Sequence, residues 1–192
     1  MSLIIGYRDQ NKVYMACDTQ RAFGKFSYSD ATETGLGVFA LPHGVLCGAT
    51  NYMIKQALRS HPDWLAPLSD EPLSKRFLLA YFVPRLGQYL DDAHMTLKNN
   101  RYDGMILLAQ EDRLYCIDND FSVINIPKYC IIGDGVDYAH PRVHRYQNEV
   151  SLPELTYAAL SDAKRFCKEI VSPFYLFTSD GTEKILLGGN TK

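Results

Sequence analysis

The chain has 192 residues, of which 46% are hydrophobic and 22% are charged, with a formal net charge of -2 at pH 7. This length fits a single domain, residues 1–192, that can bury a core without disulfides or metals. The composition excludes disordered and fibrous classes, and a near-neutral chain without a basic stripe argues against nucleic acid as a partner.

The first half of the chain predicts two β-hairpins separated by a loop. Alternating apolar runs and turn residues mark four strands and the loop between the second and third of them: strands 3–7, 13–17, 37–41 and 45–48, loop 24–31. The hairpin turns contain polar residues 8–11 and the segment Pro42-His43-Gly44.

Two helices are predicted next. A helical period begins at Thr50 and ends before His61-Pro62, and residues 67–72 form a connector. A longer helix runs from Ser74 to about Met95, and Pro84 should kink it. Its expected buried stripe consists of Phe77, Leu78, Tyr81, Phe82, Leu86, Tyr89 and Leu90.

The second half repeats this order of strands followed by helices. Strands are predicted at 105–109, 113–117, 122–126, 129–132, 174–178 and 184–187. Gly133-Asp134-Gly135 leads into a helix carrying Tyr138, and another helix covers roughly 153–171 with Phe166 and Ile170 on its apolar face. Runs of strands that alternate with pairs of helices predict an α+β fold with antiparallel sheets and helices packed outside.

Several classes of site are not expected. The five cysteines are odd in number and widely spaced, which indicates reduced thiols of the core. Only His140 and His144 share helical i, i+4 spacing, and no His-Glu-x-x-His frame is present, so no metal is expected. Gly133-x-Gly135 lacks the rest of a dinucleotide fingerprint, so no nucleotide or other cofactor is expected either.

The sequence also bears on location. No apolar stretch approaches the roughly 20 residues that span a bilayer, and the N-terminus lacks a basic region followed by a hydrophobic one. We therefore expect a cytoplasmic protein with no membrane partner.

Segments across most of the chain resemble the proteasome β subunits, bacterial-type proteasome-like proteins included, of the N-terminal nucleophile (Ntn) hydrolase superfamily. The similar segments are Ser2-Leu3-Ile4-Ile5-Gly6, Ala16-Cys17-Asp18-Thr19, Leu46-Cys47-Gly48-Ala49, Leu114-Tyr115-Cys116-Ile117-Asp118, Ile131-Ile132-Gly133-Asp134-Gly135 and Tyr138-Ala139. The resemblance implies a four-layer αββα sandwich of two antiparallel sheets flanked by helices. It also implies that the first residue of the mature chain is the nucleophile.

Carried over position by position, the resemblance implies a site around Ser2. Removal of Met1 exposes Ser2, no longer propeptide is expected, and Asp18 then has the family's separation from the nucleophile. The Gly48 N–H matches the family's oxyanion donor. A serine hydroxyl needs a nearby base, and an α-amine with a reference pKa of about 7.7–8.0 suits neutral pH. The supporting positions of the family fall on Asp134, Glu169 and Ser172.

This chain departs from the family pattern at one catalytic position. No lysine occurs between Lys25 and Lys55, and an ungapped comparison puts Thr34 where the family has its catalytic lysine. Lys25 belongs to the preceding loop, which offers poor positional precision. The family's serine in the glycine turn is Asp134 here, and Pro173 follows Ser172 where glycines are usual.

Each candidate residue also has a purely structural interpretation. Ser2 can be a small residue that follows the start methionine, Asp18 can cap the turn after its strand, and Gly48 can allow close helix packing. Their joint spacing favours the functional interpretation.

Two functions follow from these expectations. The first is a hydrolase that cleaves a peptide or amide bond with Ser2, and the second is a catalytically inactive structural or assembly subunit with the same fold. The resemblance also implies self-association into a ring or other homo-oligomer.

Overall fold

Two five-stranded antiparallel sheets form the centre of the protein in a computed structural model that describes residues 2–23, 26–29, 36–97, 99, 101–180 and 184–187. The first sheet has the order β12-β1-β2-β13-β14 and contains β1 Ile4–Arg8, β2 Val13–Cys17, β12 Tyr129–Ile132, β13 Phe174–Thr178 and β14 Lys184–Leu187. The second has the order β11-β10-β9-β6-β5 and contains β5 Val38–Leu41, β6 Val45–Ala49, β9 Ile106–Gln110, β10 Arg113–Ile117 and β11 Val123–Asn125.

The predicted hairpins are confirmed in position and pairing. Ile4 faces Cys17 and Arg8 faces Val13 across β1 and β2, and Val38 faces Gly48 across β5 and β6. β1 is central, because β12 pairs with its other side. Its apolar sequence follows from this place, since both of its faces are covered.

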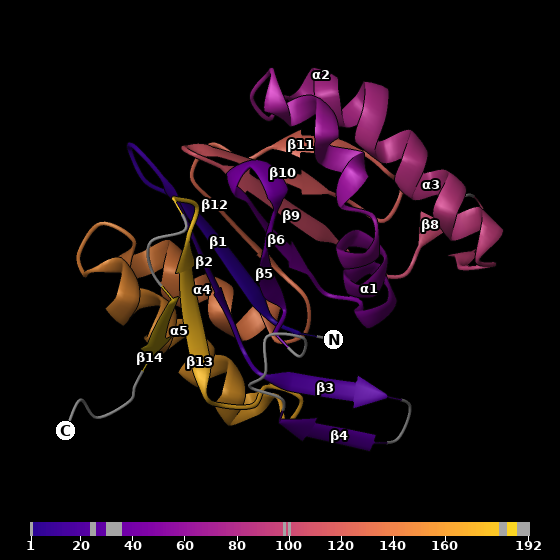
Figure 1. Ribbon diagram of the computed structural model, residues 1–192. Coiled ribbons are helices and arrows are strands. Elements are labelled where there is room, and N and C mark those ends of the chain that lie inside the picture. The colour runs from indigo at the N-terminus through magenta and orange to yellow at the C-terminus, as the bar shows by residue number, and fades with distance from the viewer. Residues whose placement is uncertain are drawn as a thin grey trace.

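Helices cover the outer face of each sheet, as Figure 1 shows. Helices α4 Val136–Tyr146 and α5 Leu152–Phe166 lie on the first sheet, on the left of the view. The second sheet carries α1 Tyr52–Ser60, the 3₁₀ segment η2 Pro62–Ser69, and the continuous helical run of α2 Lys75–Phe77, η3 Leu78–Phe82 and α3 Val83–Asp92. The short 3₁₀ segment η1 Pro42–Gly44 joins β5 to β6.

The two sheets and the helices on their outer faces form four layers, and three clusters of buried apolar side chains pack between them. Ile4 and Met15 of the first sheet meet Leu46 and Leu107 of the second in the layer between the sheets. A second layer joins the first sheet to α4 and α5, and a third joins the other sheet to α1, η2 and the long helical run. The α+β sandwich of two antiparallel sheets between helices is therefore confirmed.

The predicted long helix exists, but its interior differs from a regular α-helix. Residues 78–82 form a π-helical turn in which Val83 N–H donates to the Leu78 carbonyl, and Pro84 follows at once. Proline has no N–H to continue the i to i-4 ladder, so a wider turn is a natural way to accommodate it. Tyr81 was expected in the buried stripe and is instead 43% exposed.

Other predictions of element boundaries were wrong. Part of the predicted loop 24–31 is β4 Phe26–Ser29, which pairs with β3 Gln20–Phe23. The helix predicted for 153–171 ends at Phe166, which is 64% exposed, because the backbone of Val171 is hydrogen-bonded to Asp18 and Thr19 and must leave the helix first. The short pair β7 Thr96–Leu97 and β8 Arg101–Tyr102 was not predicted.

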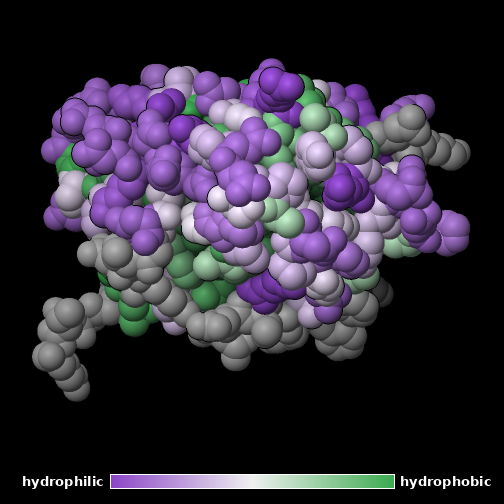
Figure 2. All heavy atoms as spheres, turned by 45° about the horizontal axis from the view of Figure 1, so that its top comes forward, coloured by the Kyte–Doolittle hydropathy of each residue, from purple (hydrophilic) through white to green (hydrophobic). Residues whose placement is uncertain are grey.

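The surface is predominantly hydrophilic on the face shown in Figure 2, where the top of Figure 1 comes forward and hydrophobic residues form scattered smaller areas. Within the described residues, no helix has the length and apolar character needed to cross a bilayer. All five cysteines are free thiols; Cys17, Cys47 and Cys116 are buried, and Cys130 and Cys167 are half-buried.

Candidate functional site

Ser2 lies just before β1 and is enclosed by the backbone of other segments. The residue is 3% exposed. A Cβ atom on Gly37 would lie 3.1 Å from the Ser2 Cβ and 3.3 Å from its Oγ, and one on Gly133 would lie 1.8 Å from the Ser2 carbonyl oxygen. Ile4, two residues on, is held between β12 and β2. The position of Ser2 is therefore set by a central strand and by two neighbours that have no side chain.

Asp18 follows β2 directly and its carboxylate binds backbone on both sides. The residue is fully buried. Its Oδ1 accepts the Leu3 N–H at 3.0 Å, and its Oδ2 accepts the Val171 N–H at 3.4 Å. N–H donors of this kind stabilise a buried carboxylate. The structure thus brings Asp18 against the residue next to Ser2.

Thr19 completes this connection and was missed by the sequence analysis. Its N–H and its Oγ1 each donate to the Val171 carbonyl at 3.1 Å. Together with Asp18, it fixes the segment between α5 and β13 against the end of β2. A Thr after a strand gives no signal of this kind in the sequence, because its partner is 152 residues away.

A second group of acidic residues lies beyond Gly133. This glycine has φ +98°, and its neighbour Asp134 is half-buried. Cys167 Sγ donates to Glu169 Oε2 at 3.2 Å, and this hydrogen bond lowers the pKa of the Glu169 carboxyl. Burial raises the pKa of the Cys167 thiol, and the charges of Glu169 and Asp134 add to that rise. Glu169 is therefore bound to Cys167, and Gly135, the residue after Asp134, lies beside the same side chain, with an added Cβ 3.6 Å from the Cys167 Cβ.

Gly48, the predicted oxyanion donor, lies within β6. It is not at a strand-to-helix junction, and it faces Leu107 of β9. The Ala49 N–H donates to Gly37 and the Thr50 N–H donates to Met105, so alternation along the strand directs the Gly48 N–H to β9. Its missing side chain leaves room for Ile4, whose Cγ2 would be 3.0 Å from an added Cβ.

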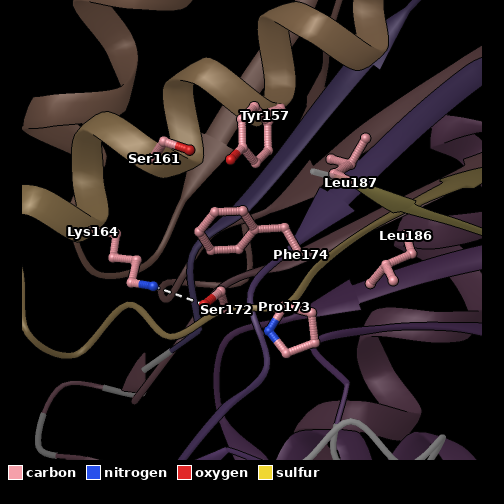
Figure 3. A pocket seen from close by; sticks show the side chains of 8 residues that line it. All are labelled: Tyr157, Ser161, Lys164, Ser172, Pro173, Phe174, Leu186 and Leu187. Carbon is pink, nitrogen blue, oxygen red and sulfur yellow. Dashed lines mark hydrogen bonds between the residues drawn. The ribbon is translucent and has the colours of Figure 1, made fainter. Parts of the chain in front are cut away.

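Ser172 points into a separate pocket on the outer side of the first sheet. Lys164 Nζ donates to Ser172 Oγ at 2.7 Å, as the dashed line in Figure 3 shows. The pocket has a volume of about 360 Å³ between α5 and the β13–β14 edge. Tyr157, Phe174 and Leu186 are among its lining residues. The hydroxyl is thus engaged with Lys164 in this pocket, while the preceding residue, Val171, contacts Asp18.

Lys55 is a buried cation that the sequence analysis did not select. It is 3% exposed on the inner side of α1, beside the buried Ile54 and Leu58. The available signal was a lysine within the apolar stripe of a predicted helix. The two positions considered for the family lysine, Lys25 and Thr34, lie outside the described residues.

The sequence has no match among protein-family models, and no curated protein matches it either. Solved structures do match. A Thiobacillus denitrificans protein named BPH, solved in complex with epoxomicin, has a TM-score of 0.73 at 18% identity, covering 97% of this chain and 100% of that one.

Two further neighbours agree with this match. HslV from Trypanosoma brucei has a TM-score of 0.66 at 12% identity, covering 92% of this chain and 98% of that one. Anbu, described as an ancestral beta-subunit, from Yersinia bercovieri has a TM-score of 0.67 at 13% identity, with 98% and 88% covered. Identities this low support a common fold and no more. The chain therefore has the proteasome-like fold of the Ntn hydrolases.

Proposed function

We propose that this protein is a hydrolase that cleaves a peptide or amide bond with Ser2 as its nucleophile once Met1 is removed. The observation that carries the proposal is the position of Ser2, which is buried at the start of a central strand with Asp18 bound to the next residue. A rigid strand and a buried carboxylate are what a positioned nucleophile requires. The fold shared with HslV and Anbu supports the same conclusion.

The reaction is an acyl transfer through one residue. The Ser2 Oγ adds to the substrate carbonyl carbon while its proton passes to the Ser2 α-amine, and the ammonium then protonates the leaving nitrogen as the C–N bond breaks. Water hydrolyses the resulting ester by the reverse proton path. Asp18 holds the Leu3 N–H and so keeps the start of β1 in place during both steps.

The test is the intact mass of the purified native protein with and without a peptide epoxyketone. Such a probe combines with both the hydroxyl and the free α-amine of one residue, and the Thiobacillus denitrificans neighbour was solved with epoxomicin. We expect a mass that lacks Met1 and a single adduct, which Ser2→Ala abolishes. Ser161→Ala, in the pocket of Figure 3, should retain the adduct and serves as the matched control.

A non-catalytic subunit is the second candidate. It is favoured by the absence of a lysine between Lys25 and Lys55 and by the direction of the Gly48 N–H into the sheet. A retained Met1, or a free Ser2 that the probe leaves unmodified, would support this candidate and contradict the hydrolase.

Self-association is part of the proposal in either case. The Anbu neighbour is described as a subunit, and exposed apolar side chains gather on α4 and α5 of this protein: Tyr138 and Phe166 stack with ring centroids 5.1 Å apart while 45% and 64% exposed. We infer that a second copy covers this pair, as in a ring or another homo-oligomer.

A further inference from the structure

The pocket on the outer side of the first sheet combines polar and apolar side chains. Its volume of about 360 Å³ is in the range of small-molecule sites in proteins. It lies between α5 and β14, the last strand of the sheet, as Figure 3 shows. Gly37 and Gly133, which lie against Ser2, do not line it. The pocket is therefore separate from the candidate site around Ser2.

The floor of the pocket is apolar. Phe174 of β13 faces Leu187 of β14 across the two strands, and these residues are 2% and 6% exposed. Leu186 and Tyr157 lie beside them and are 48% and 42% exposed. The Tyr157 ring meets the Phe174 ring edge to face, with 6.2 Å between centroids. Large, partly exposed side chains around a buried apolar floor favour a ligand with an apolar part.

The α5 side of the pocket carries hydrogen-bond donors. Tyr157, Ser161 and Lys164 are spaced i, i+4, i+7, which places them on one stripe of the helix. Among the described residues, Ser172 Oγ is the one hydrogen-bond partner of Lys164 Nζ, and no carboxylate pairs with this ammonium group. An ammonium group has three N–H donors, so two remain for a ligand.

The two hydroxyl groups on this stripe are also available. Within the described part of the chain, neither Ser161 Oγ nor Tyr157 OH has a hydrogen-bond partner, and Figure 3 shows both on the α5 side of the pocket. A hydroxyl group can donate to an anionic oxygen beside the lysine. The polar groups therefore favour a ligand that accepts hydrogen bonds.

The charges around the pocket favour a ligand with a single negative charge. Lys164 is the one charged residue among the described residues that line it, and Asp162, close by on α5, is bound to Arg142 at 2.7 Å. Lys164 lies in the last turn of α5, where the carbonyl end of the helix dipole disfavours a second negative charge. A carboxylate therefore fits this pocket better than a doubly charged phosphate.

We propose that this pocket binds a small amphiphilic carboxylate. Its apolar group covers Phe174 and Leu187, and its carboxylate accepts hydrogen bonds from Lys164 Nζ and Ser161 Oγ. A free organic acid has this chemistry, and so does the C-terminal residue of a peptide that ends in an apolar side chain. Binding does not depend on the proposed hydrolase function, because neither Ser2 nor Asp18 lines the pocket.

The experiment is a titration followed by NMR of isotope-labelled leucine methyl groups, which reports on Leu186 and Leu187 and is suited to large assemblies. The probes are phenylbutyrate and the peptide acetyl-Gly-Gly-Phe with a free C-terminal carboxylate. We expect saturable shifts of these methyl groups with a Kd of about 1 mM or lower for at least one probe. The amide of the same probe should bind about tenfold more weakly. The tighter of the two acids identifies the ligand as a free acid or a chain end.

Two pairs of variants test the two halves of the ligand. Lys164→Met should weaken binding about tenfold or more, whereas Lys168→Met removes an exposed lysine outside the pocket and should leave binding unchanged. Leu186→Ser should weaken binding about fivefold, with the Leu187 methyl groups as reporters. Leu79→Ser is its control, because Leu79 is 49% exposed on the other helical layer.

Thermal unfolding shows whether each variant is folded, and Lys164→Gln is a second neutral replacement for the lysine. Equal affinity for the acid and its amide overturns the proposal, as does full affinity in a folded neutral variant of Lys164. The absence of saturable shifts with either probe at millimolar concentration overturns it as well.

Discussion

Gly133 is the position near Ser2 where an added side chain would fit least well. Its φ of +98° is unfavourable for any other residue, and an added Cβ would lie 1.8 Å from the Ser2 carbonyl oxygen. The unfavourable φ concerns the backbone of residue 133 alone, whereas the clash of an added Cβ also involves Ser2. Gly44 also has a positive φ, +70°, but has nothing within 4 Å of an added Cβ, so it reports on backbone conformation without a clash.

We predict that Gly133→Ala lowers the free energy of unfolding by about 3 kcal/mol or more, because backbone strain and a clash with Ser2 add together. Gly44→Ala carries the strain alone and should cost about 1–2 kcal/mol. Urea unfolding measures both, and adduct formation reports on Ser2. Equal losses for the two variants would mean that the β1 backbone moves aside without penalty.

The resemblance to proteasome β subunits related Ser2 to Asp18 by their spacing, and the structure places the Asp18 carboxylate on the N–H of Leu3, the residue after Ser2. The same reasoning could not identify Lys55, Thr19 or the direction of the Gly48 N–H. Each of these depends on contacts with segments distant in the chain, for example Thr19 with Val171. Local pattern contains no information about such contacts.

At the scale of elements, Gln110 at the end of β9 is hydrogen-bonded to two loops, the one before α2 and the one between β5 and β6. Its Oε1 accepts the Leu73 N–H at 2.6 Å, and its Nε2 donates to the His43 carbonyl at 2.8 Å. One side-chain amide therefore supplies hydrogen-bond partners to a backbone N–H in the loop before α2 and to a backbone carbonyl in the turn between β5 and β6. Buried backbone groups without such a partner are costly.

Replacement of Gln110 by leucine should lower the free energy of unfolding by about 2–3 kcal/mol, because it leaves a buried N–H and a carbonyl unpaired. Gln88→Leu is the matched control, since the Gln88 amide makes an exposed contact with Asp92 at 2.9 Å. The control should stay within about 0.5 kcal/mol of the native protein. Midpoints of urea unfolding give both values, and indistinguishable midpoints would contradict the bridging role of Gln110.

At the scale of the whole molecule, the outer helices leave large side chains in contact with solvent. Tyr138 and Phe166 stack on the α4–α5 side, whereas Leu79 and Tyr81 are exposed on the opposite helical layer. A contact between copies should bury one of these faces, and the stacked aromatic pair offers the more compact anchor.

Light scattering after size exclusion should give a multiple of 21.8 kDa for the native protein. Phe166→Asp places a charge in the proposed contact and should shift the mass toward the monomer, while Tyr81→Asp should not. A native mass of one subunit would contradict self-association. A shift with Tyr81→Asp alone would move the contact to the other helical layer.

The sequence by itself determined the fold class and the succession of strands and helices, because these depend on local periodicity and on neighbouring strands. Only the tertiary structure decided where α5 ends, why Gly133 has no side chain and that Lys55 is buried. The end of α5 depends on Asp18 and Thr19, and the burial of Lys55 depends on how α1 packs on the second sheet. Such contacts join segments far apart in the chain, and their geometry exists only once both sheets and their helices have packed together.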